Sequence, residues 1–328
     1  MALETGAERL ERKTSAMHMG PGRLAIVAVV LGLIIGGAAG YLLLSAGKTD
    51  RPELVIALQP TSSPQNISAK AVELKLFLQA RLPEVEVKVN VPLDSTVVIA
   101  SLKAGQAQVA LMGAWPAALA NREAGAEIVM AEKREVIIGT EKKNETYYYS
   151  YYVSLKGRGF STLDDASGGR ICFTSKTSTS GYLFPLATLV KTGRIPTPEG
   201  GSVADPKAFF SEPRWPGNYQ ACWESLKQGQ SDVGVIAGDV PESLYNEVLA
   251  ATTVLETNGP VPSHTVVFSK DLAEPLRSKV LDAFLELGKP EHRALMRKLV
   301  SSIFVEFVVT TTDAHTQGLK EALELTNL

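Results

Sequence analysis

Short apolar runs of strand length alternate along most of this chain with segments in which apolar residues recur at helical spacing. Residues 54–58 (LVIAL) form a run typical of a buried strand, and residues 84–91 (EVEVKVNV) alternate valine with polar residues, which is typical of a strand. Between them, residues 68–82 carry apolar residues on one helical face, namely Ala71, Leu74, Leu78 and Leu82. The globular part therefore opens as strand, helix and strand.

The same alternation continues and predicts an α/β fold. Asp94 or Ser95 caps a helix that ends at Gly105. A strand over 107–112, a helix over 114–123 and a strand over 127–131 follow. Strands that alternate with helices imply a sheet covered on both faces, and ligands of such sheets bind at the carboxyl ends of the strands.

A second α/β series follows the tyrosine-rich segment 147–153, which we expect to be a long strand and a crossover between lobes. Prolines and glycines predict that residues 195–218 are mostly loop. Around this loop the pattern predicts strands over 170–173, 233–237, 252–255 and 265–268, and helices over 182–192, 219–228, 239–247, 272–287 and 291–300.

The N-terminal region differs, because residues 24–47 contain no charged side chain. A membrane-spanning helix needs about 20 apolar residues. A cleaved signal, cut near Ala38–Ala39 or Ser45–Ala46, is the alternative, but such signals usually have an apolar core of about 7–15 residues, so an uncleaved anchor is favoured. Lys and Arg number four before this run and two just after it, which predicts a cytoplasmic tail over 1–23 and residues 48–328 outside.

Composition narrows the function classes. The apolar fraction of 45% and charged fraction of 21% indicate a globular protein, and the formal net charge of −2 argues against nucleic-acid binding. Cys172 and Cys222 are the two cysteines, and their spacing offers no CxxC metal motif. They could pair in an oxidising exterior, but two buried free thiols are the default expectation, and both interpretations stay open.

Ser178-Thr-Ser-Gly181 is the sharpest candidate for chemistry, because it joins a predicted strand to a helix. Its hydroxyls and free backbone N–H groups at a helix N-terminus suit an anion, although an ordinary helix cap would explain one of the hydroxyls. Thr61-Ser-Ser63 has the same logic after the first strand, where a capped turn is the simpler explanation. The tyrosines of residues 147–152 either bind an oxyanion or form a half-buried strand.

Enzyme and cofactor signatures are weak. The chain has four histidines and lacks the GxSxG, HExxH, Walker A and GxGxxG motifs, so no cofactor is expected. His264 is either a ligand-binding group or a satisfied histidine, since no spacing supports a Ser–His–Asp set.

Four local motifs make residues 53–308 resemble the phosphate, phosphite and phosphonate-binding proteins of ABC importers, the PhnD-like group. They are Pro60-Thr-Ser-Ser-Pro-Gln-Asn66, the segment 102–113 (LKAGQAQVALMG), Ser178-Thr-Ser-Gly-Tyr-Leu-Phe-Pro185 and the segment 217–235 with its QGQSDVG. The third motif is the most specific.

The resemblance implies a bilobal class II periplasmic-binding-protein (Venus-flytrap) fold, here preceded by one N-terminal transmembrane helix. We expect lobe 1 over 53–148 plus 265–328, lobe 2 over 149–264, and crossovers near 147–155 and 261–268. The resemblance places the anion between the lobes. The residues it implies in the site are Ser63, Ser95, Tyr148, Ser178, Thr179, Ser180, Tyr219, Asp239 and His264.

Departures from the family pattern suggest the kind of ligand. Ser95 stands where the family has a second tyrosine, and Tyr219 where it has a histidine. Asp239 and His264 fall where binders of aminoalkylphosphonates carry two acids for the ligand amine. Losing one acid favours a ligand without a positive tail, such as phosphate, phosphite or a simple phosphonate.

The sequence thus predicts a monomeric, membrane-tethered solute-binding protein that delivers a small oxyanion to an ABC permease without chemistry. A sensor input domain, a binder of another solute such as a sulfonate or a vitamin precursor, and an enzyme on a similar α/β frame remain as alternatives.

Overall fold

The computed structural model describes residues 51–59, 64–299 and 303–328, and residues 52–328 form one compact unit. The predicted anchor over 24–47 and the motif Thr61-Ser-Ser63 lie outside the described residues. Among the residues that are described, no helix has the length and apolarity to cross a membrane.

The first sheet has the strand order β12-β4-β11-β3-β1-β2, and β5 pairs with β4 outside this path. Strand β1 is parallel to β2 and β3, whereas β11, β12 and β5 pair antiparallel with their neighbours. The bounds are β1 Glu53–Leu58, β2 Glu86–Asn90, β3 Val109–Met112, β4 Glu127–Ile138, β5 Glu141–Glu145, β11 Thr265–Phe268 and β12 Phe304–Val309.

Helices cover both faces of this sheet. Successive residues of a strand point to opposite faces, and both faces carry apolar side chains that the helices bury. In β1, Leu54 and Ile56 join one apolar core, while Val55 and Ala57 join another. The first core includes side chains of α2 (Pro64–Arg81), α8 (Leu276–Leu287) and α9 (Arg293–Leu299). The second includes those of α3 (Ser95–Lys103) and α4 (Ala114–Ala124).

The second sheet has the order β10-β6-β9-β7-β8. β6 is antiparallel to β9 and β10, and β7 is parallel to β8 and β9. Its strands are β6 Tyr147–Leu155, β7 Arg170–Cys172, β8 Glu212–Arg214, β9 Val233–Ala237 and β10 Thr252–Pro262, and its helices are α5 Phe184–Lys191, α6 Tyr219–Lys227 and α7 Glu242–Ala251.

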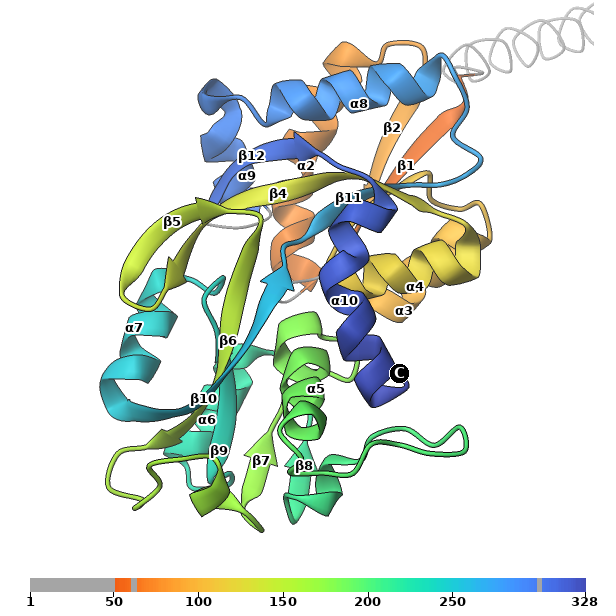
Figure 1. Cartoon of the computed structure of the whole chain (residues 1–328). Coiled ribbons are helices and arrows are strands. Elements are labelled where there is room, and N and C mark those ends of the chain that lie inside the picture. The colour runs from red at the N-terminus through yellow and green to blue at the C-terminus, as the bar shows by residue number, and fades with distance from the viewer. Residues whose placement is uncertain (1–50, 60–63, 300–302) are drawn as a thin grey trace, which may run out of the picture. The chain divides into compact units, whose positions relative to one another are not determined.

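The chain passes between the two sheets twice, which makes the fold bilobal. It leaves β4 through the β5 hairpin to enter β6, and it returns from β10 to β11 through Ser263 and His264 (Figure 1). The last helix, α10 (Thr312–Thr326), packs on α4 and β4 of the first lobe and on α5 and β10 of the second. The exact lobe boundaries at residues 148 and 264 therefore stay a prediction.

Most predicted elements are confirmed, with differences at their ends. β4 continues to Ile138 and β10 to Pro262, several residues beyond the predicted strands. The predicted helix over 239–247 begins only at Glu242, after Pro241, and residues 179–183 form a π-helical turn before α5. No prediction covered β5, β12 and α10.

The default expectation of two free thiols was wrong, because Cys172 and Cys222 form a disulfide. Their Cα atoms lie 5.5 Å apart although 50 positions separate them along the chain. The end of β7 and the first turn of α6 meet only in the folded lobe, so the cysteine spacing alone gave no sign of this pairing.

Candidate functional site

Helix N-termini from both lobes meet at the Ser178–Gly181 loop. In the first lobe, α3 follows β2 and is capped by Asp94, whose side chain accepts a hydrogen bond from the Val97 N–H (3.0 Å). α4 follows β3 at Gly113, which offers no capping side chain. Each helix N-terminus carries roughly half a positive charge, so this arrangement favours a negatively charged occupant.

The Ser178–Gly181 loop of the second lobe is held in a tight conformation. The Ser178 hydroxyl accepts a hydrogen bond from the Gly181 N–H (3.0 Å), and the Thr174 N–H donates to the Gly181 carbonyl (3.2 Å). A Cβ atom at Gly181 would lie only 1.9 Å from the Thr174 hydroxyl. Glycine is therefore required here because the backbone approaches the Thr174 side chain so closely.

Two hydrogen bonds join the lobes at this loop. The Ser95 hydroxyl at the start of α3 donates to the Thr177 hydroxyl (2.9 Å), and the Trp115 N–H at the start of α4 donates to the Thr179 hydroxyl (3.0 Å). Thr179 is 5% exposed, so its hydroxyl is shielded from water by both lobes. Backbone donors of the first lobe and hydroxyls of the second are thus within reach of the same small group.

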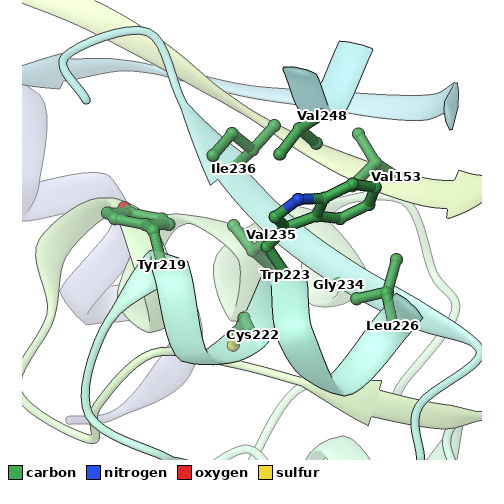
Figure 2. Close-up of a pocket in the computed structure, with 9 residues that line it drawn as sticks. All are labelled: Val153, Tyr219, Cys222, Trp223, Leu226, Gly234, Val235, Ile236 and Val248. Atoms are coloured by element: carbon green, nitrogen blue, oxygen red, sulfur yellow. The ribbon is translucent and has the colours of Figure 1, made fainter. Parts of the chain in front are cut away.

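Two tyrosines flank Ser180. The Tyr148 hydroxyl from β6 lies 3.0 Å from the Ser180 hydroxyl, and the Tyr219 hydroxyl lies 2.6 Å from it. Burial raises the pKa of both phenols, so both stay neutral and keep a proton to donate. Tyr219 is the first residue of α6, and it is also one of the residues that line a small apolar pocket between α6 and β9 (Figure 2).

A buried charge cluster adjoins Tyr148. The Arg134 guanidinium is bound by Glu132 (2.7 Å) and by Asp239 (2.8 Å), and Arg134 and Glu132 are almost fully buried. Burial raises the pKa of the Asp239 carboxyl, and the charge of Arg134 opposes this rise. Arg134 on β4 and Asp239 after β9 come from different lobes, so their ion pair is a further link between the lobes.

His264 lies in the connection from β10 to β11, and its Nε2 atom is 4.0 Å from the Asp239 carboxylate. Burial and the nearby charge of Arg134 lower its pKa well below the usual range, so the imidazole is neutral. Neither Asp239 nor His264 therefore presents an unpaired charge to the loop.

The structure brings most of the predicted site residues together. Six of them lie in or beside the Ser178–Gly181 loop: Ser178, Thr179 and Ser180 belong to it, and Ser95, Tyr148 and Tyr219 lie next to it. Asp239 and His264 lie in the adjoining charge cluster, and Ser63 lies outside the described residues. Their role in binding a ligand stays a prediction.

Sequence reasoning missed Thr177, Glu132 and Arg134. The segment 132–135 (EKRE) looks like a solvated surface by composition. Its one structural signal is the spacing of Glu132 and Arg134, which puts their side chains on the same face of a strand.

Comparison with known proteins places this bilobal α/β fold among solute-binding proteins. A family model described as "ABC transporter, phosphonate, periplasmic substrate-binding protein" matches residues 56–315. The chain belongs to this family, and it is the substrate-binding component of an ABC transporter. The predicted resemblance is thereby confirmed.

Solved structures show the same fold at low sequence identity. A binding protein component of an ABC phosphonate transporter from Pseudomonas aeruginosa is 18% identical, with a TM-score of 0.66 over 84% of this chain and 86% of that chain. PhnD1 from Prochlorococcus marinus, solved in complex with methylphosphonate, is 15% identical, with a TM-score of 0.65 over 83% and 97%. The aliphatic sulphonate binding protein SsuA from Escherichia coli is 17% identical, with a TM-score of 0.50 over 76% and 78%.

The charge cluster yields a stability prediction. Arg134→Met keeps the side-chain volume but leaves Glu132 and Asp239 without their counter-charge, so we expect a loss of about 3–5 kcal/mol in the free energy of unfolding at pH 7. Without the charge of Arg134, burial raises the pKa of the Asp239 carboxyl further in the folded state. Protonation restores stability as the pH falls, and the deficit shrinks toward about pH 4.

Urea unfolding at pH 7 and pH 4 measures this effect. Lys191→Met is the matched control, because Lys191 forms an exposed ion pair with Glu321 and its loss should cost less than about 1 kcal/mol. An Arg134→Met protein as stable as the wild type at pH 7 would show that the cluster is not held as an ion pair.

Proposed function

We propose that this chain binds a small tetrahedral phosphorus oxyanion, namely phosphate, phosphite or a simple phosphonate, between its two lobes at the Ser178–Gly181 loop. The single observation that carries the proposal is the meeting of helix N-termini from both lobes at the Thr179 hydroxyl. Burying an anion is costly unless its oxygens are fully hydrogen-bonded, and this place concentrates donors in a dry site.

The donors are neutral, which suits a ligand that must be released again. The Ser95 hydroxyl now donates to the Thr177 hydroxyl, and the Thr179 hydroxyl accepts from the Trp115 N–H. The Ser180 hydroxyl bonds to the phenols of Tyr148 and Tyr219. Hydroxyl hydrogens can turn toward a new acceptor without movement of the chain. An oxyanion would therefore replace bonds within the site rather than require new groups to be brought in.

The charge cluster supports a ligand without a positive tail. A cationic amine needs an acidic partner, but Asp239 already pairs with Arg134 at 2.8 Å, and His264 is neutral. PhnD1 from Prochlorococcus marinus, which shares the fold, was solved with methylphosphonate, a ligand of the proposed kind.

The transport role follows from the two lobes. A ligand that contacts donors of both lobes binds more tightly when the lobes touch than when they are separated. Binding therefore shifts the protein toward the conformation in which the lobes touch, and the difference between the two affinities sets the size of the shift. The protein would act as a monomer, present the ligand to the permease in this state and leave it chemically unchanged.

Removing one donor tests the site. Thr179→Val keeps the side-chain shape but removes the hydroxyl, and we expect the affinity for methylphosphonate or phosphate to fall by roughly tenfold or more, because a hydrogen bond to a charged group contributes about 1.5–3 kcal/mol. The rise in melting temperature caused by the ligand should disappear with it.

Thr188→Val is the matched control for this test. The Thr188 hydroxyl donates to the Phe184 carbonyl within α5 and lies outside the loop, so its loss should leave the affinity unchanged. An unchanged affinity in Thr179→Val would show that the anion binds elsewhere.

Ligand selectivity is a second test. Calorimetry with methylphosphonate, phosphite, phosphate, methanesulfonate and 2-aminoethylphosphonate should show that the added amine gives no gain in affinity, since Asp239 is already paired. Far tighter binding of aminoethylphosphonate would overturn the proposal about the tail, and a preference for methanesulfonate would favour the sulfonate alternative. Phosphorus NMR of the recovered ligand would reveal turnover if the protein were an enzyme.

We further propose that residues 24–47 tether the protein to the membrane with its binding lobes outside. The support is the uncharged apolar run and the excess of Lys and Arg before it. A tether raises the effective concentration of the binding protein at its permease.

An epitope tag placed before Met1 tests the tether. An uncleaved anchor keeps the tag on a protein that stays in the membrane after alkaline extraction, while protease added outside the cell digests the lobes and spares the tag. Loss of the tag with release of the protein would show that the segment is a cleaved signal.

A further inference from the structure

The start of α6 has little regular structure to hold it in place. It follows residues 195–218, where the regular elements are a single turn at Pro206–Ala208 and the three-residue strand β8. Asn218 caps the helix by accepting a hydrogen bond from the Ala221 N–H (2.8 Å). This cap fixes the shape of the first turn, but it does not fix where that turn lies relative to the Ser178–Gly181 loop.

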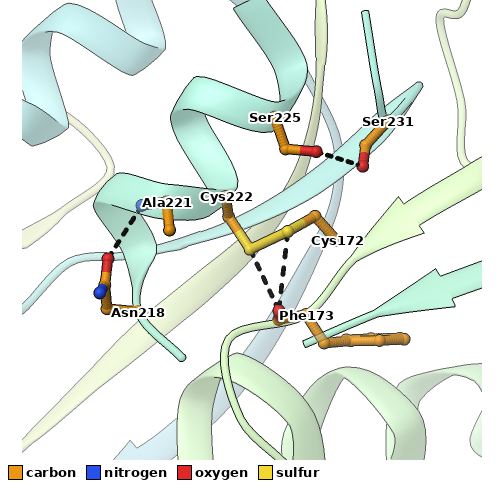
Figure 3. The surroundings of a disulfide bond; sticks show 7 residues. All are labelled: Cys172, Phe173, Asn218, Ala221, Cys222, Ser225 and Ser231. Carbon is orange, nitrogen blue, oxygen red and sulfur yellow. Dashed lines mark hydrogen bonds between the residues drawn. A yellow bond between two sulfur atoms is a disulfide. The ribbon is translucent and has the colours of Figure 1, made fainter. Parts of the chain in front are cut away.

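Hydrogen bonds and one covalent bond connect this first turn, and Gly217 just before it, to the segment that leads to Ser180. The Gly217 N–H donates to the Thr174 carbonyl (2.7 Å), Tyr219 bonds to Ser180, and Cys222 is bonded covalently to Cys172. Only the disulfide among them is covalent. Figure 3 shows it running from the first turn of α6 to the end of β7.

The disulfide, the Tyr219 hydrogen bond and the chain segments between them form one closed loop of bonds. Cys222 lies three residues after Tyr219, so the two are neighbours one turn apart on α6. On the other side, Cys172 lies two residues before Thr174, whose N–H binds the Gly181 carbonyl next to Ser180. The bridge therefore sets the separation between the helix and the loop at a point one turn from the phenol.

Packing on β9 and the links at the first turn position different parts of α6. A small apolar pocket lies between α6 and β9, lined on the helix by Tyr219, Cys222, Trp223 and Leu226 (Figure 2). Opposite them stands Gly234, whose missing side chain makes room for Leu226, since a Cβ at Gly234 would lie only 2.3 Å from the Leu226 Cδ1 atom. This close contact sets the distance between α6 and β9, while the links at the first turn set the position of Tyr219 against the Ser178–Gly181 loop.

We infer that the Cys172–Cys222 disulfide is a positioning element of the oxyanion site, which holds the Tyr219 phenol against Ser180 so that the phenol can donate to the ligand. The inference rests on the proposed function. The contact between Tyr219 and Ser180 is 2.6 Å, and hydrogen bonds weaken once the oxygens separate beyond about 3.0 Å. A shift of α6 by a fraction of an ångström is therefore enough to remove Tyr219 from the site.

A double-mutant cycle on the whole protein tests the inference, with methylphosphonate as the probe. Cys172→Ala with Cys222→Ala should raise the dissociation constant about tenfold, as loss of one hydrogen bond to a charged group would. Tyr219→Phe should cause a similar loss in the disulfide-bonded protein. In the disulfide-free protein, Tyr219→Phe should change the dissociation constant by less than about twofold, because the phenol is already displaced.

The cycle separates positioning from general stability. A disulfide that only stabilises the lobe would lower the melting temperature on removal but leave the dissociation constant and the effect of Tyr219→Phe unchanged, and that result would overturn the inference. Leu244→Ala on α7 of the same lobe is the control, since it should lower the melting temperature through lost core packing with the affinity intact.

Three further outcomes can be distinguished. If the alanine pair does not fold, Cys172→Val with Cys222→Ala fills more of the vacated volume and is measured in the same way. If the disulfide-bonded wild type binds neither methylphosphonate, phosphite nor phosphate, the proposed function itself fails. If it binds and the disulfide-free protein binds equally well, the proposed function stands and only the positioning role is lost.

Discussion

The hydrogen bond from the Trp115 N–H to the Thr179 hydroxyl is the constraint around which the rest of the structure is arranged. It joins the first turn of a helix in one lobe to the polar loop of the other, at a place where both chains approach closely. Gly113 begins α4 without a capping side chain, and Gly181 fits a space in which a Cβ would collide with Thr174. Gly113 thus leaves an N–H group at the start of α4 free to bond to Thr179 of the other lobe, and Gly181 lets the loop backbone lie against Thr174.

The lobes meet through two kinds of polar contact that differ in how readily they exchange partners. Around Thr179 and Ser95 the contacts are hydroxyl bonds between neutral groups, which can be traded for bonds to an anion at small cost. Between Arg134 and Asp239 the contact is a buried ion pair, and breaking it leaves charge stranded in the interior. The neutral contacts are therefore suited to exchange with a ligand. The ionic contact is suited to keeping the two lobes in a fixed position relative to each other.

Local signals in the sequence were sufficient to predict the elements that have a capping residue at one end or a clear apolar pattern along their length. The run 54–58, the Asp94 cap and the valine alternation before it each correspond to an element of the structure, because propensity and burial agree there. The loop motif at Ser178–Gly181 was recognisable for the same reason. β4 was predicted too short because its buried ion pair puts Glu132 and Arg134 into a strand interior, where composition alone indicates a surface. The disulfide depends on residues that only the folded lobe brings together.

The bond between Cys172 and Cys222 also has a consequence for where in the cell the protein is active. Thiols stay reduced in the cytoplasm, and disulfides form and persist outside it. On the inference drawn above, a chain that has not yet been exported lacks the bond that places Tyr219, and it holds phosphorus oxyanions only weakly. A newly made binding protein would then leave the phosphate of the cytoplasm free for metabolism and gain its full affinity on the side of the membrane where scavenging is useful.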